Sequence, residues 1–120
     1  MPVGLTSQNI VDTPPNNVGW YDLGVRPGEV GAANLDGHAT GAFDNLHNLQ
    51  TGNDIYTVDA LGQQFHFKVL EKELVDISSF PIQKVYGAIN RVRLNLVTCA
   101  GSFNPADNDF TQRVIIYSDR

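Results

Sequence analysis

The sequence has little cysteine, little positive charge and no long apolar run. Cys99 is the only cysteine in 120 residues, which excludes an internal disulfide and leaves the redox environment open. Eight Lys and Arg, scattered along the chain, face thirteen Asp and Glu, and the net charge of -5 argues against nucleic acids and anionic membrane surfaces as partners. No stretch approaches the roughly 20 apolar residues of a spanning helix. The opening MPVGLTSQNI also lacks the basic flank and apolar centre of a signal peptide.

What is present is the pattern of a β protein. Eleven glycines and six prolines interrupt short runs of β-branched and aromatic residues. With 42% hydrophobic residues, the chain is rich enough in apolar side chains for a buried core, and its length suits one domain over residues 1–120. We therefore predict an all-β fold: a closed or partly open β-barrel of about seven to eight short strands, with one or two short helical turns.

Several segments can be assigned individually. Residues 12–37 are dense in turn formers, with a short strand expected at 32–35. Apolar residues three apart in 43–50 predict a 3₁₀ or α turn. IYTVD and QFHFKVL around ALGQ predict a β-hairpin whose Phe65, Phe67 and Val69 point inward. The strands RVRLNLVT and RVIIYS follow, separated by AGSFNPADNDFTQ, which we expect to be a polar loop.

Cys99 stands where the apolar run LNLVTC gives way to small, polar residues. A structural cysteine more naturally lies inside such a run, whereas a reactive one needs solvent access and an electropositive neighbour. Strand alternation places Leu94 and Leu96 on the core side, so that Cys99 is expected to look out of the barrel wall beside Arg93 and Asn95. This position favours a reactive thiol.

A reactive thiol needs a base and a cation, and the sequence offers one candidate for each. His66 and His47 are explained as exposed side chains of the hairpin and the turn. His38, in NLDGHATGAF, lies instead at the edge of a loop with small residues beside it. Arg113 begins the last strand, fourteen residues after the cysteine, so an antiparallel return would place its guanidinium beside the thiol. On position alone, Arg113 could equally be a solvated surface charge.

Metal and cofactor sites have little support. Asp36 and His38, with His47 or Cys99, could form a zinc set, but no closely spaced ligand pair fixes such a geometry. Asp44 and Asp54 are too sparse for a calcium site, and no glycine pattern matches a phosphate loop. We therefore predict no metal and no cofactor.

Four stretches in order resemble the sortases, the cysteine transpeptidases of Gram-positive bacteria. The opening PVGLTSQNIVDTPPNNVGWYDLGVRPGEVGAANLDGH is similar to the family's VGWY segment, PGE turn and histidine-bearing GH, in a form most similar to class F. GAFDNLHNLQTGNDI resembles the family's F..L..L..GD.I stretch, LNLVTC its TLxTC signature, and FTQRVIIYS its arginine-bearing last strand. The resemblance covers almost the full length.

The resemblance implies roles for individual residues. Cys99 would be the nucleophile, His38 the general acid or base, and Arg113 the group that holds the peptide and stabilises the oxyanion. Thr98, Val97 and Ala100 would bind substrate, Thr98 by shaping the peptide pocket and the oxyanion site. The chain departs from the family where Asn95 replaces the first threonine of TLxTC, and where an N-terminal anchor and a first strand are not recognisable, which would leave a barrel edge unpaired.

The resemblance further implies cleavage of an LPxTG-like sorting signal between Thr and Gly through a thioacyl intermediate. The acyl group would pass to an amine of a peptidoglycan precursor, at the extracellular face of the cell membrane or in the cell wall, with an N-terminal anchor as the only membrane contact. Two other readings fit the same residues. One is a plain cysteine hydrolase, and the other is a non-catalytic, peptide-binding or self-associating β-barrel whose open edge takes up a strand.

Overall fold

The alternation of apolar residues along the last two strands builds the centre of the fold. The computed structural model describes residues 3–4, 18–21, 24–39, 43–59, 61–106 and 109–120. The elements are β1 (Val3–Gly4), β2 (Val18–Trp20), β3 (Gly31–Asp36), the 3₁₀ turn η2 (Leu46–Asn48), β4 (Asp54–Val58), β5 (Gln64–Asp76), the 3₁₀ turn η3 (Ile77–Ser79), α1 (Ile82–Tyr86), β6 (Val92–Asn104) and β7 (Asp109–Asp119).

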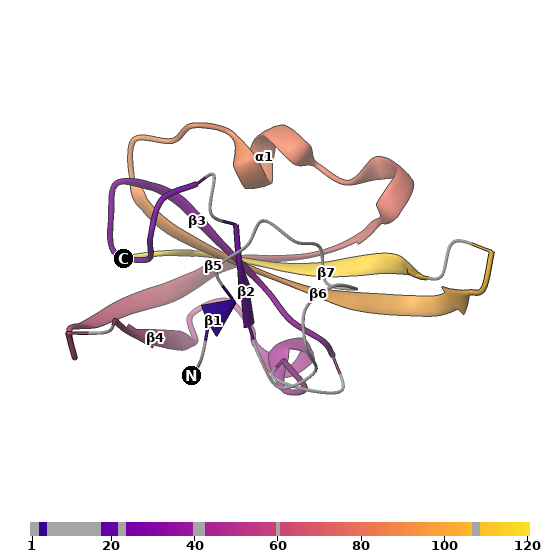
Figure 1. Ribbon diagram of the computed structural model, residues 1–120, viewed down its shortest axis with the longest axis horizontal. Coiled ribbons are helices and arrows are strands. Elements are labelled where there is room, and N and C mark those ends of the chain that lie inside the picture. The colour runs from indigo at the N-terminus through magenta and orange to yellow at the C-terminus, as the bar shows by residue number, and fades with distance from the viewer. Residues whose placement is uncertain (1–2, 5–17, 22–23, 40–42, 60, 107–108) are drawn as a thin grey trace.

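The strands of this described part form one sheet of seven, in the order β1-β2-β3-β6-β7-β5-β4. The sheet is strongly curled, with β1 and β4 at its two edges, so the predicted partly open barrel is confirmed (Figure 1). β5 and β6 have thirteen residues each and β7 has eleven, so these strands are longer than the short strands expected. The described residues contain three short helical turns, η2, η3 and α1.

The two faces of the central strands are both covered. Leu94, Leu96, Val114 and Ile116 point into the larger core, together with Phe67, Val69 and Leu46. The opposite face, which we call the α1 face, carries Val97, Cys99, Ile115 and Tyr117, and Val85 of α1 packs against it. In Figure 1, α1 lies across the sheet above β6 and β7.

Most of the segment predictions agree with the structure. The strand expected at 32–35 is β3, the turn expected within 43–50 is η2, and the hairpin is β4 with β5. Phe67 and Val69 are buried and Phe65 is partly buried, while His66 is exposed. Residues 12–17 and 22–23 of the predicted irregular segment lie outside the described residues.

The loop predicted at residues 100–112 is wrong. β6 continues to Asn104 and β7 begins at Asp109, so the hairpin extends beyond the body of the sheet (Figure 1). A β-bulge between Ala100 and Phe103 shifts the register of β6 against β7, and Gly101 within it has a φ of +76°. Beyond the bulge, the rings of Phe103 and Phe110 pack edge to face at 5.4 Å and pair the strands again.

No helix among the described residues has the length and apolar character needed to cross a bilayer.

Candidate functional site

Three adjacent strands bring His38, Cys99 and Arg113 together. β3 and β6 run parallel, and their last paired residues are Asp36 and Val97. His38 and Cys99 each come two residues later, just past the end of this pairing. On the other side of β6, Cys99 pairs directly with Arg113 of antiparallel β7. The sheet therefore places the three residues side by side although they are far apart in the sequence.

Cys99 does not look out into solvent as the alternation along its strand suggested. It is only 6% exposed, because Val85, Ile115 and Tyr117 cluster with it and Phe80 packs against this cluster. No element was predicted for residues 71–90, and this segment covers Cys99 through η3 and α1. The predicted face of the strand was right, but that face is buried.

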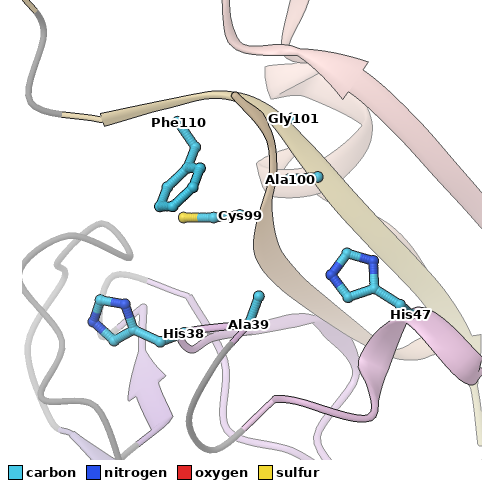
Figure 2. A pocket seen from close by; sticks show the side chains of 7 residues that line it. All are labelled: His38, Ala39, His47, Cys99, Ala100, Gly101 and Phe110. Atoms are coloured by element: carbon cyan, nitrogen blue, oxygen red, sulfur yellow. The ribbon is translucent and has the colours of Figure 1, made fainter. Parts of the chain in front are cut away.

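The thiol nevertheless borders an open space. A pocket of about 300 Å³ is lined by His38, Ala39, His47, Cys99, Ala100, Gly101 and Phe110. Figure 2 shows the Cys99 sulfur directed into the space between the Phe110 ring and His38, with His47 approaching from η2. A thiol and an imidazole therefore share one cavity in which a small part of a ligand could lie against both.

Arg113 lies beside Cys99 in register, but its guanidinium is held along its own strand. Nη2 donates to Asp109 Oδ2 at 2.7 Å, and Nη1 donates to the carbonyls of Phe110 at 3.2 Å and Gln112 at 3.0 Å. Arg113 is 8% exposed and does not line the pocket. The arginine is thus next to the cysteine, with part of its donor capacity committed to Asp109.

The electrostatic environment of Cys99 favours the protonated thiol. Burial is the main cause that raises its pKa, and the carboxylates of Asp109 and Asp36 raise the pKa further. The guanidinium of Arg113 acts in the opposite direction and lowers it. A nucleophilic step at this sulfur therefore needs a base that takes the thiol proton as the new bond forms.

The three residues expected to bind substrate occupy different places. Ala100 lines the pocket. Val97 is buried on the α1 face and lines a second, very small hollow with Tyr86 and Asp36. Thr98 is fully buried and points to the other side of the strand, where its hydroxyl donates to the Gly37 carbonyl at 2.7 Å.

Sequence reasoning missed two neighbours of the site. His47 was interpreted as an exposed polar residue; it is exposed, but it also lines the pocket. Asp109 was assigned to a loop, and its ion pair with Arg113 was not foreseen. Their spacing of four residues could have predicted this ion pair, because in an extended segment it puts both side chains on one face.

Among the described residues, no group of three or more His, Cys, Asp and Glu side chains is placed to hold a metal ion. His38, His47 and Cys99 line the same pocket but do not form such a group.

Comparison with known proteins gives one family and one fold. The model of the sortase domain matches residues 2–120. Among solved structures, the chain is similar to the SrtA sortase from Actinomyces oris, with a TM-score of 0.73 and 23% identity over 98% of this chain and 67% of that one. It is also similar to sortase C from Clostridium perfringens SM101, with a TM-score of 0.63 and 21% identity, and to sortase A from Corynebacterium diphtheriae, with a TM-score of 0.68 and 20% identity.

These structural likenesses support the fold alone, because all three identities are below 25%. Both of the latter alignments cover 86% of this chain, and the chain spans about half the length of those two structures, 53% and 47%. No curated protein sequence matches the chain.

Proposed function

This chain belongs to the sortase family, and from that premise we propose that it is a cysteine transpeptidase for LPxTG-like sorting signals. The observation that supports this most is the shared pocket of His38 and Cys99 beside a strand that carries Arg113. In this proposal Cys99 is the nucleophile, His38 the acid and base, and Arg113 the group that stabilises the oxyanion. Residues 1–120 form the catalytic domain.

The first half-reaction cleaves the peptide. Cys99 Sγ attacks the carbonyl carbon of the Thr-Gly bond, and the thiol proton passes to the His38 imidazole. The carbonyl oxygen gains negative charge, which a guanidinium directed toward it stabilises. The C–N bond then breaks, the imidazolium returns its proton to the departing glycine amine, and the threonine acyl group remains on the sulfur.

The second half-reaction transfers the acyl group. An amine of a peptidoglycan precursor attacks the thioester carbonyl, and His38 accepts the proton that the amine loses. The C–S bond breaks, the thiolate takes up this proton, and the free thiol returns. Ala100 borders the pocket where the peptide would lie, and Val97 remains a predicted substrate-binding residue. Thr98 is fully buried outside the pocket lining, so it would shape the pocket without touching the peptide.

Two finer assignments also belong to this proposal. The VGWY, PGE and GH segments favour class F, whereas the solved structures reported above include sortases of types A and C. We place the reaction at the extracellular face of a Gram-positive cell membrane, where sorting signals and wall precursors meet.

A panel of fluorogenic LPxTG-like peptides, read with intact-mass detection of the protein, tests the proposal. We expect a thioacyl adduct on Cys99, no cleavage by Cys99→Ala, and almost none by His38→Ala. Arg113→Ala should lose about 100- to 1,000-fold in kcat, as expected for an oxyanion donor. His66→Ala is the matched control: His66 is exposed, pairs with Asp54 and lies outside the pocket, so its loss should leave the rate unchanged.

The alternative readings predict other results. A hydrolase gives the same free-acid product with or without an added amine, whereas a transpeptidase forms the amide when the amine is present. Failure of every peptide to acylate Cys99, with the protein folded, would favour a non-catalytic binding module. Wild-type rates from Cys99→Ala would refute the proposal.

A further inference from the structure

The peptide immediately before His38 is fixed from three sides. The Gly37 N–H donates to the Val97 carbonyl at 3.2 Å, one residue beyond the last β3–β6 pair. The Gly37 carbonyl accepts the Thr98 hydroxyl at 2.7 Å. A Cβ on Gly37 would lie 3.1 Å from the ring of Phe43, so the ring packs closely on this glycine. Every polar group of Gly37 is therefore tied to β6.

The Thr98 bond has an unusual place in the ladder. In a parallel pair, main-chain hydrogen bonds are evenly spaced along both strands. Here the last paired residues are Asp36 and Val97, and His38 and Cys99, two residues further along each chain segment, both line the pocket. The hydroxyl of Thr98, one residue beyond Val97 within β6, holds the Gly37 carbonyl, so the peptide that carries His38 stays tied to β6 past the last paired residues.

Thr98 cannot reach a ligand in the pocket directly. It is fully buried, it does not line the pocket, and it lies on the opposite side of β6 from Cys99. Its hydroxyl acts on a carbonyl one residue from His38, and the His38 carbonyl in turn accepts the Phe43 N–H at 3.1 Å. The backbone of His38 is thus fixed before and after the side chain.

We propose that Thr98 is a positioning residue, which sets the place of the His38 imidazole through its hydrogen bond to the Gly37 carbonyl. This rests on the proposed function of His38 as acid and base. A displacement of a catalytic group by about 1 Å can cost about 100-fold in rate. Loss of the bond should therefore lower kcat, while KM changes little because Thr98 lies outside the pocket lining.

The chain offers a matched control for the loss of a buried hydroxyl. Ser118 is also fully buried, and its hydroxyl also donates to a main-chain carbonyl, that of Leu94, at 2.7 Å. It lies on β7 away from the pocket. Ser118→Ala and Thr98→Val remove comparable bonds, so both should lower stability, but only Thr98→Val should affect His38.

The experiment compares wild type, Thr98→Val, Thr98→Ser and Ser118→Ala. We expect Thr98→Val to lower kcat about 10- to 100-fold with KM within about twofold. Thr98→Ser keeps the donor and should remain within about threefold of wild type. Ser118→Ala should keep wild-type kcat. Unchanged kcat in Thr98→Val, an equal loss in Ser118→Ala, or no recovery in Thr98→Ser would each overturn the proposal.

A second readout separates this proposal from the proposed function. The ring Cε1–Hε1 signal of His38, assigned with His38→Gln, is recorded by NMR in the same four proteins. It should move in Thr98→Val and stay in place in Thr98→Ser and Ser118→Ala. If wild type cleaves no peptide, the proposed function fails, and an unmoved His38 signal in Thr98→Val would still refute the positioning role.

Discussion

Asn95→Ala should destabilise the protein through a hydrogen-bond network that joins three elements. Asn95 is fully buried on the α1 face, and its Nδ2 donates to Asn34 Oδ1 of β3 and to the Val85 carbonyl of α1, both at 3.0 Å. Its Oδ1 has no hydrogen-bond partner among the described residues. The substitution therefore leaves two buried acceptors without donors and removes one buried, unsatisfied oxygen.

The size of the effect follows from this balance. Each buried acceptor left unpaired lowers the free energy of unfolding by about 1–3 kcal/mol. Removal of the unsatisfied Asn95 Oδ1 raises it by about the amount of one such group. The small void left by the side chain adds about 1 kcal/mol. We therefore expect the free energy of unfolding to fall by about 2–4 kcal/mol, a large part of the stability of a domain of this size.

Urea unfolding, with the m-value held as a check on two-state behaviour, measures this loss. Asn45→Ala is the control, because Asn45 is exposed and its side chain makes no capping bond, so the change should stay within about 0.5 kcal/mol. The same Asn95→Ala protein should also show faster alkylation of Cys99 by a neutral haloacetamide, since α1 is held less firmly over it. A loss below about 0.5 kcal/mol in Asn95→Ala would refute the reasoning.

Three further predictions concern charge and packing around the site. Burial holds the pKa of the native Cys99 thiol above that of the unfolded chain, so the unfolded chain loses its proton first as pH rises. The stability difference between wild type and Cys99→Ser should therefore shrink with increasing alkaline pH in urea unfolding, and a growing difference would contradict this. Asp109→Asn removes a carboxylate that raises the pKa of the thiol and frees Arg113, so alkylation of Cys99 at neutral pH should become faster, not slower. Tyr117→Phe removes a 2.7 Å hydrogen bond from the phenol to Glu73 and should lower the unfolding free energy by about 1 kcal/mol, a loss that thermal unfolding would detect.

The sequence was most informative where the strands are regular. Alternation along RVRLNLVT identified the core side of β6, and the hairpin of β4 and β5 was found from its alternating Phe65, Phe67 and Val69. Because strands of period two leave a clear pattern, these elements could be predicted from local residues alone.

The environment of Cys99 could not be predicted in the same way. The sequence indicates which face of the strand carries the cysteine, but it does not indicate that Val85 and Phe80, from a segment without a clear period, cover that face. The ion pair of Asp109 with Arg113 could not be predicted for a related reason. The polar residues of 100–112 favour a loop, whereas contact between the rings of Phe103 and Phe110 extends the hairpin through Asp109. Both depend on tertiary contacts that override local propensity.

Intact-mass analysis of the protein after incubation with LPxTG-like peptides, followed by mapping of the modified residue, is the most direct test of the central claim. We predict that the mass increases by the fragment ending in threonine, that Cys99 carries this fragment, and that an added amine removes it as an amide. An acyl group found on another residue, or peptide cleavage that continues in Cys99→Ala, would contradict the account.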